Sequence, residues 1–89
     1  MPRKHIVVSG RVQGVGFRYH CVQLADACKL TGWVCNLDSG EVELEIQGKE
    51  EDIEKFFALL DKRSMFIRID QIQSQDCEEI REDSFIVRY

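Results

Sequence analysis

A glycine-rich nonapeptide constrains this chain more than any other segment. Residues Gly10–Arg18 read Gly-Arg-Val-Gln-Gly-Val-Gly-Phe-Arg. Three glycines within seven positions let the backbone curl and turn its N–H groups inward. The segment follows a strand-like run, His5–Val8, and leads into a helix-like run that begins at about Phe17. Because a curled loop at a helix N-terminus binds tetrahedral oxyanions, the sequence predicts an anion site here.

Arg18 adds a fixed positive charge at the first turn of the expected helix. Its planar guanidinium carries a fork of N–H donors that can clamp two oxygens of a phosphate. The alternative interpretation of the same residues is a glycine-rich turn beside an arginine that is merely exposed. The rest of the sequence decides between the two.

Composition and charge narrow the class of protein. With 89 residues, 44% of them hydrophobic and 31% charged, we expect one small globular domain over residues 1–89. The net charge of −4 argues against broad nucleic-acid or anionic-membrane binding, although a small anionic substrate responds to local charge. No apolar run approaches the ~20 residues that span a bilayer. The N-terminus does not resemble a signal peptide, so we expect a cytoplasmic protein.

The four cysteines are Cys21, Cys28, Cys35 and Cys77. They form no Cys-x-x-Cys pair and no cluster with metal-ligand spacing. Reduced thiols are the expected state in the cytosol. Cys21 and Cys28 fall on the apolar stripe of the first expected helix, where we expect small buried side chains rather than a redox or metal site. The sequence assigns no disulfide.

Hydrophobic periodicity and composition divide the chain into eight expected segments. We expect strands at 4–9, 31–37, 41–47, 66–73 and 84–89, helices at 17–28 and 50–62, and a polar loop at 74–83. Strand 41–47 alternates cleanly, and its glutamates Glu41, Glu43 and Glu45 are expected on a solvated face. Helix 50–62 has acidic residues in its first turn and Lys62-Arg63 at its end, which suits the helix dipole.

The order of these elements predicts the fold class. It is β-α-β-β-α-β plus a short C-terminal strand, the split βαβ or ferredoxin-like arrangement of α+β proteins. We expect an antiparallel sheet with two helices on one face. Many unrelated functions use this fold, so it says little about function.

Two motifs and the end of the chain resemble the acylphosphatase family. The first motif is Gly-x-Val-Gln-Gly-Val-x-Phe-Arg, which Gly10–Arg18 matches without a departure. The second is Gly-Trp-Val-x-Asn-x-x-x-Gly-x-Val-Glu, found at Gly32–Glu43. The ending Phe85–Tyr89 is similar to the family's last strand. The resemblance covers essentially the whole chain, in order and with the expected spacings.

The resemblance implies an enzyme that hydrolyses acyl phosphates to a carboxylate and inorganic phosphate. It implies a monomer that needs no metal or organic cofactor. The family's phosphate-clamping arginine falls on Arg18, and its water-positioning asparagine falls on Asn36. The phosphate cradle falls on backbone N–H groups of the loop, at Gln13, Gly14, Val15, Gly16, Phe17 and Arg18.

The chemistry of Asn36 agrees with the implied role. A carboxylate base would repel the negative phosphoryl group, whereas an amide is neutral and offers both a donor and an acceptor. Since the acyl leaving group is already good, positioning and electrostatic stabilisation carry most of the catalysis. By itself, Asn36 also suits a strand end before the turn at Asp38-Ser39-Gly40.

The chain departs from the family's pattern at four places. Lys29 stands where a glycine often ends the first helix, and a positive φ there would cost about 1 kcal/mol. Cys35 and Ser39 replace a common polar and a common acidic residue. Arg63–Met65 stands where a Gly-Pro pair is common, so the loop before the fourth strand is expected to differ in shape. None of these positions is Arg18 or Asn36.

Other functional readings of the same residues remain as alternatives. One is a non-catalytic module on this fold that binds phosphate, another anion or nucleic acid; another is an acyl-phosphate site within a larger assembly. The run from Gly14 begins like a dinucleotide fingerprint but lacks its third glycine. His5 and His20 are the only histidines. We expect His20 to be a helix-surface or partly packed residue, with a phosphohistidine or general-base role as the alternative, and Trp33 to pack in the core or on the sheet. Arg11 and Arg88 are minor candidates for raising the local potential.

Overall fold

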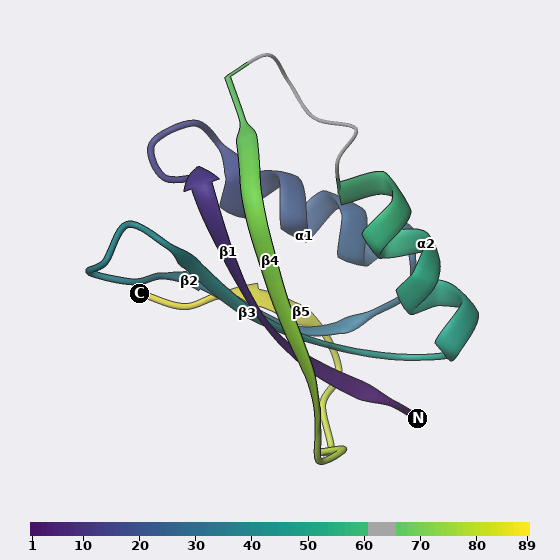
Figure 1. The fold of residues 1–89 in the computed structure, drawn as a ribbon. Helices are drawn as coiled ribbons and strands as arrows, with labels where there is room; N and C mark the ends of the chain where they lie inside the picture. Colours follow the sequence, from purple (N-terminus) through teal and green to yellow (C-terminus); the bar gives the residue numbers. More distant parts are fainter. Residues whose placement is uncertain (61–65) are drawn as a thin grey trace.

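The computed structural model describes residues 1–60 and 66–89. Within them lie seven elements, which Figure 1 labels along the chain: β1 (Arg3–Arg11), α1 (Phe17–Ala27), β2 (Thr31–Asn36), β3 (Val42–Gln47), α2 (Glu50–Leu60), β4 (Arg68–Cys77) and β5 (Phe85–Val87). The predicted order of strands and helices is confirmed. No helix in the described ranges is long and apolar enough to cross a membrane.

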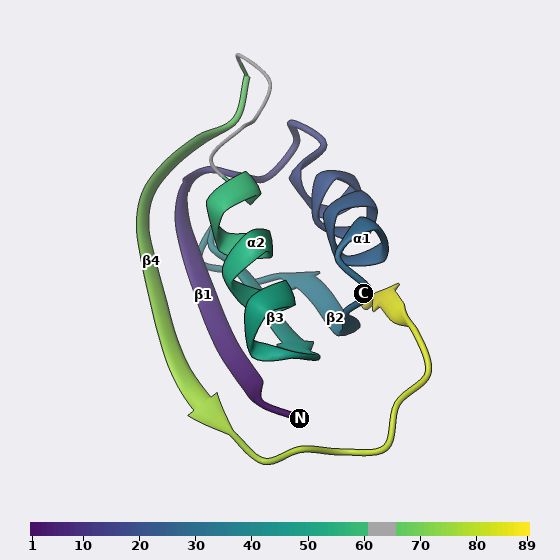
Figure 2. The same cartoon turned by 90° about the vertical axis from the view of Figure 1, so that its right-hand side faces the viewer.

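The five strands form a mixed sheet in the order β4-β1-β3-β2-β5. β1 pairs with β3 and β4, and β2 with β3, all antiparallel. β5, however, pairs with β2 in the parallel sense, so the expectation of an antiparallel sheet is wrong at this edge. The reason is the path of the chain: after β4 it crosses below the sheet to the opposite edge and returns as β5, in the direction of β2 (Figure 2).

Both helices cover one face of the sheet, as predicted (Figure 2). The strand residues on that face are branched and apolar, and the helices place their own apolar stripes against them. The core comprises Ile6, Val8, Val34, Val42, Leu44 and Ile46 from the sheet, Phe17, Cys21 and Ala25 from α1, and Ile53, Phe56 and Leu60 from α2. Burial of this surface is the main force that holds α1, and the loop before it, on the sheet.

Two glycines allow neighbouring strands of the sheet to approach closely. Gly10 has a φ of +130° at an irregularity in the pairing of β1 with β4, and a Cβ there would run into the carbonyl of Arg68. Gly32, with a φ of +145°, lies so close to β3 that a Cβ would meet the carbonyl of Glu45. Both positions therefore require glycine for backbone packing, in addition to any role in a motif.

β4 is longer than the sequence predicted. The expected polar loop at 74–83 is wrong for residues 74–77, which continue the strand and pair with β1 down to Arg3. β4 is an edge strand, and polar residues such as Gln73, Gln75 and Asp76 suit an exposed edge. The pairing energy comes from the backbone of β1, so no apolar alternation marks it.

Some predictions fall outside the described residues. These are the last two residues of the predicted helix 50–62, the basic pair Lys62-Arg63 at its end, and the altered loop at Arg63–Met65. The strand predicted at 66–73 begins at Arg68 in the structure.

Candidate active site

The glycine-rich loop joins β1 to α1 at the end of the sheet where the β2–β3 turn also lies (Figure 1). Gly14 and Gly16 have φ values of +73° and +82°, a conformation that suits glycine. Gly16 is the N-cap of α1, and no side chain in the described ranges caps this helix end. Since the first intrahelical bond is donated by His20 to Gly16, the N–H groups of the first turn remain available to a ligand.

Arg18 lies in this first turn and is half-buried. Its guanidinium carbon is 5.3 Å from the centroid of the Tyr89 ring, a cation–π contact. No carboxylate in residues 1–60 or 66–89 pairs with it. The positive charge therefore has an aromatic ring beside it and no counter-ion among the described residues, which suits capture of an anion.

A cavity of about 400 Å³ opens at the loop and extends along α1 toward β5. Its walls come from three segments: Val12, Gly14, Gly16, Phe17, Arg18, Tyr19, Val22, Val87 and Tyr89. The structure thus brings together four of the predicted cradle positions, Gly14, Gly16, Phe17 and Arg18. Gln13 and Val15 are not among the lining residues.

Gln13 instead uses its side chain to hold the loop against the β2–β3 turn. Its Nε2 donates to the carbonyl oxygens of Leu37 and Glu41, at 2.8 Å each. Leu37 follows Asn36 directly, so this side chain ties the glycine-rich loop to the strand end that carries the asparagine. Sequence reasoning assigned only the Gln13 backbone to the site, because a side-chain bond to a distant carbonyl leaves no pattern in the sequence.

Asn36 is the last residue of β2 and is half-buried. Its Oδ1 is buried and has no hydrogen-bond partner among residues 1–60 and 66–89. Buried polar atoms are almost always paired, and leaving one unpaired costs about 1–3 kcal/mol. A buried acceptor left without a partner at this strand end is a place for a water or a substrate group.

Comparison with known proteins decides the family. The family model described as Acylphosphatase matches residues 4–87. The chain belongs to the acylphosphatase family. It is 42% identical over 80 residues to an acylphosphatase of Bacillus licheniformis, covering 90% of this chain and 89% of that one. An acylphosphatase of Clostridium perfringens is 46% identical over 76 residues, 85% of each chain.

Solved structures agree with this family assignment. The crystal structure of acylphosphatase from Bacillus subtilis superposes with a TM-score of 0.93 at 37% identity, over 100% of both chains. The structure of an acylphosphatase from Coxiella burnetii has a TM-score of 0.90 at 32% identity, over 98% of this chain and 92% of that one. The crystal structure of full-length HypF in the phosphate- and nucleotide-bound form is also similar, with a TM-score of 0.92 and 32% identity. The match covers 99% of this chain and 12% of the HypF chain. The α+β, ferredoxin-like fold is therefore that of acylphosphatases, hydrolases of acyl phosphates.

The departure at Lys29 has the consequence predicted for this acylphosphatase. Lys29 follows the end of α1 with a φ of +60°, the left-handed conformation that favours glycine. It is the one non-glycine residue with a positive φ in the described ranges. Its side chain is exposed and points away from the core, so the cost falls on stability.

None of the histidines and cysteines lines the cavity at the glycine-rich loop. His5 pairs with Glu43 at 2.7 Å on the face of the sheet without helices, and His20 is half-buried with an unpaired Nε2. All four cysteines are free, and Cys21 and Cys28 are buried as predicted. Burial raises the pKa of the Cys21 thiol to about 12, so it is neutral and unreactive. No group of three or more possible metal ligands occurs in the described part of the chain.

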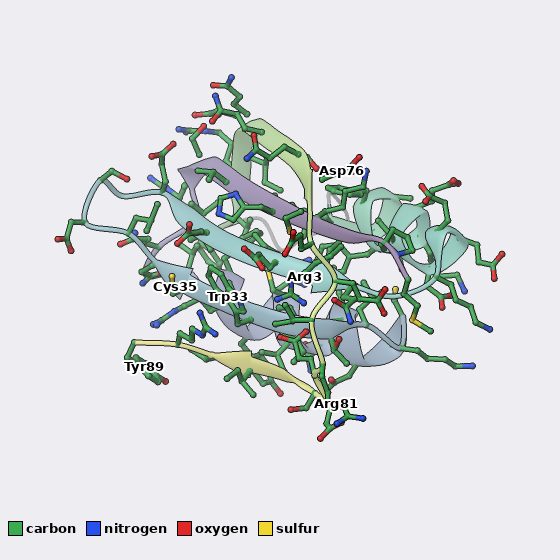
Figure 3. All side chains as sticks on the ribbon, turned by 90° about the horizontal axis from the view of Figure 1, so that it is seen from below. Arg3, Trp33, Cys35, Asp76, Arg81 and Tyr89 are labelled. Atoms are coloured by element: carbon green, nitrogen blue, oxygen red, sulfur yellow. The ribbon has the colours of Figure 1, made fainter. Side chains whose placement is uncertain are left out.

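The face of the sheet without helices carries a buried arginine that sequence reasoning missed. The side chain of Arg3 is 1% exposed and donates to Glu45 at 2.7 Å, to both carboxylate oxygens of Glu82 at 2.7 and 3.2 Å, and to Gln47 at 3.1 Å. Gln47 in turn exchanges two hydrogen bonds with the backbone of Ile80. Figure 3 shows Arg3 beneath the segment that returns from β4 to β5.

This network fixes the return segment, residues 78–84, across the sheet, and thereby positions β5 and Tyr89 beside the cavity. The glutamates of β3 do face away from the helices, as predicted, but Glu43 and Glu45 are ion-paired rather than simply solvated. Trp33 packs on the same face, with the guanidinium of Arg88 4.4 Å from its ring centroid. Arg88 is thus engaged with a ring outside the cavity walls.

Proposed function

We propose that this acylphosphatase binds the phosphoryl group of an acyl phosphate in the loop Gln13–Arg18 and holds the attacking water with Asn36. The observation that carries the proposal is the buried, unpaired Oδ1 of Asn36, on a strand end that Gln13 ties to the loop. The uncapped helix end and the unpaired charge of Arg18 support the same assignment. Backbone N–H groups of the loop and first turn, together with the Arg18 guanidinium, are the expected phosphate donors.

The reaction needs little beyond these groups. The water oxygen attacks phosphorus, the bond between phosphorus and the acyl oxygen breaks, and its electron pair leaves with the carboxylate. Both water protons pass to the phosphate product, whose ionisation then follows the pH. The developing charge on the phosphoryl oxygens is stabilised by fixed donors, and the neutral amide of Asn36 orients the water without repelling them. We propose that no metal ion or organic cofactor takes part.

The same proposal covers the setting of the enzyme. We propose a monomeric, cytoplasmic protein in which residues 1–89 act as one domain and which does not bind nucleic acid. The net charge of −4 argues against nucleic-acid binding. Modules that bind single-stranded RNA on such a sheet stack bases on exposed aromatic rings. Here the face without helices offers Trp33, which is only 8% exposed and covered by Arg88, and carries the acidic Glu43 and Glu45.

Hydrolysis of benzoyl phosphate, followed in the ultraviolet with a chelator present, tests the proposal. Arg18→Gln is expected to lower kcat/KM by about 10³-fold and to weaken inhibition by inorganic phosphate. Asn36→Ala is expected to lower kcat by about 10²-fold while phosphate inhibition stays within about threefold. Arg81→Gln, an exposed arginine on the return segment, serves as the control and should match the wild type.

Two results would contradict the assignment. Near-native turnover by Asn36→Ala would remove the water-positioning role. A folded wild type that binds phosphate but hydrolyses no acyl phosphate would favour the non-catalytic anion-binding module. Retention on a nucleic-acid column at low salt would contradict the last part of the proposal.

A further inference from the structure

The cavity at the loop has two chemically different ends. One end is polar and is formed by the glycine-rich loop and Arg18. The other end is more apolar and is lined by Tyr19 and Val22 of α1, by Val87 of β5 and by Tyr89 beyond it. A volume of about 400 Å³ lies within the range of small-ligand pockets, ~300–1,000 Å³. This is more room than a single tetrahedral anion fills.

The spacing along α1 suits a substrate that reaches from one end to the other. Arg18 and Val22 are four residues apart and therefore lie one above the other on the same side of the helix, about 6 Å apart along its axis. In an acyl phosphate the acyl carbons begin two bonds beyond phosphorus. A phosphoryl group bound at Arg18 would thus place the acyl group against the turn that carries Val22.

β5 supplies the opposite side of this apolar end. Val87 pairs with Val34 of β2 and is half-buried, so its position is set by the sheet. Figure 3 shows Tyr89 at the far end of this edge, beyond Val87 along the chain. The Tyr89 ring is fully exposed and touches the Arg18 guanidinium, while Tyr19 is 67% exposed. Two exposed aromatic rings flank a cavity floor of two valines.

Exposed aromatic rings at the mouth of an apolar cavity are typical of ligand sites, because aromatic side chains supply contact area with little loss of conformational freedom. Neither tyrosine ring contributes to the core of buried residues. Stability of the fold therefore gives no reason for the rings to gather at this place, whereas contact with a ligand does.

We propose that Val22, Val87 and the two tyrosines form a subsite for the acyl group, and that the enzyme prefers acyl phosphates whose acyl group is a ring or a branched apolar chain. This inference rests on the proposed function, because it assigns the phosphoryl group to the loop. A small acyl group such as acetyl leaves the apolar end unfilled and gains only the phosphate contacts. A benzoyl group removes apolar surface from water on both the substrate and the cavity walls.

The test compares benzoyl phosphate with acetyl phosphate in the wild type and in the double variant Val22→Thr/Val87→Thr. Threonine replaces one methyl of valine by a hydroxyl at nearly the same volume, so the shape of the cavity is kept while its polarity changes, and urea unfolding checks that the variant is folded. The ratio of kcat/KM for benzoyl over acetyl phosphate is expected to exceed about 10 in the wild type and to fall about tenfold in the double variant. The matched control is Val7→Thr, at a half-buried valine on β1 outside this cavity, and it should leave the ratio unchanged.

A binding measurement separates the subsite from the chemistry. Benzylphosphonate and methylphosphonate carry the two kinds of group on a phosphorus that cannot be hydrolysed. Tighter binding of benzylphosphonate, lost in the double variant, supports the subsite even if turnover fails. Equal affinities, or an unchanged kcat/KM ratio in the double variant, would overturn the subsite while leaving the proposed function intact. A chain that bound neither phosphonate nor inorganic phosphate would overturn both.

Discussion

Arg3 and Arg18 are both at least half-buried, but their surroundings are opposite. Arg3 lies on the face of the sheet without helices, and its donors bond to two carboxylates and an amide within 3.2 Å. Arg18 lies at the uncapped start of α1, with an aromatic ring beside it and no carboxylate partner among the described residues. Both guanidinium groups are positively charged and shielded from solvent to some degree. They differ in whether the described residues of the protein supply carboxylate partners.

The amides near each arginine repeat the contrast. Gln47, beside Arg3, uses both its oxygen and its nitrogen in hydrogen bonds. Asn36, near Arg18, keeps a buried oxygen without a partner. A polar cluster that is fully paired stabilises the fold, whereas one left incomplete is completed by a ligand. This difference in pairing is a sharper indicator of a site than the number of charges is.

The largest effects are expected from the same substitution at the two arginines. Arg3→Gln leaves Glu45 and Glu82 without their cation, so we expect the free energy of unfolding to fall by about 3 kcal/mol. Arg18→Gln is expected to change stability by less than about 0.5 kcal/mol, since no ion pair is lost, although turnover falls steeply. Urea unfolding and benzoyl phosphate hydrolysis, measured on both variants, check the contrast. A large loss of stability in Arg18→Gln would contradict the contrast between the two arginines.

The two amides should separate in the same way, with smaller effects. Gln47→Ala removes bonds to Arg3 and to the backbone of Ile80, and we expect it to lower the free energy of unfolding by about 2 kcal/mol. Asn36→Ala removes no described bond of Oδ1, so the free energy of unfolding should not fall by more than about 0.5 kcal/mol. Thermal and urea unfolding measure both. Equal destabilisation by the two substitutions would mean that pairing does not distinguish the regions.

Gln13 connects the loop to the strand end and tests whether that connection matters. Gln13→Ala removes both bonds to the β2–β3 turn, and the loss of alignment between phosphoryl group and water is expected to lower kcat about tenfold. Inhibition by inorganic phosphate should change little, because the N–H groups and Arg18 remain. Gln71→Ala, at an exposed position of β4, is the control. A rise in KM with kcat unchanged would place Gln13 in phosphate binding instead.

The smallest effects concern two lysines with different backbone conformations, left-handed at Lys29 and α-helical at Lys55. Lys29→Gly relieves the cost of a positive φ, so we expect about 1 kcal/mol of added stability with turnover unchanged. Lys55→Gly, in the middle of α2, should instead cost about 1 kcal/mol. Urea unfolding measures the change in the free energy of unfolding for both variants. Opposite signs for the same lysine-to-glycine change would show that the backbone conformation of residue 29 is the cause. A loss of stability in Lys29→Gly would contradict the strain.

The sequence predicted those parts of the molecule that depend on local pattern. The alternation of β3, the apolar stripes of both helices and the glycines of the loop are each readable from neighbouring residues. The candidates Arg18 and Asn36 came from a resemblance carried by two motifs. The positive φ of Lys29 was expected because a glycine is common at that place, and the structure bears it out.

The features that were missed depend on contacts between distant residues. β4 extends to Cys77 because the backbone of β1 pairs with it, although the side chains of 74–77 show no apolar alternation. The parallel pairing of β5 follows from the path of the return segment. The bonds of Gln13 to the β2–β3 turn and the partners of Arg3 join residues 24 to 79 positions apart. Such partners are set by the tertiary fold, and single-residue chemistry does not reveal them.

The return segment has a consequence for how this molecule acquires activity. The cavity takes its walls from the glycine-rich loop, from α1 and from β5, which lie near opposite ends of the chain. During synthesis the loop and α1 leave the ribosome before β5 does, and the cavity is incomplete until β5 has paired with β2. Closing such long loops slows folding relative to proteins rich in local contacts. Recovery of turnover after dilution from denaturant therefore reports completion of the whole fold, whereas helical signal can return earlier.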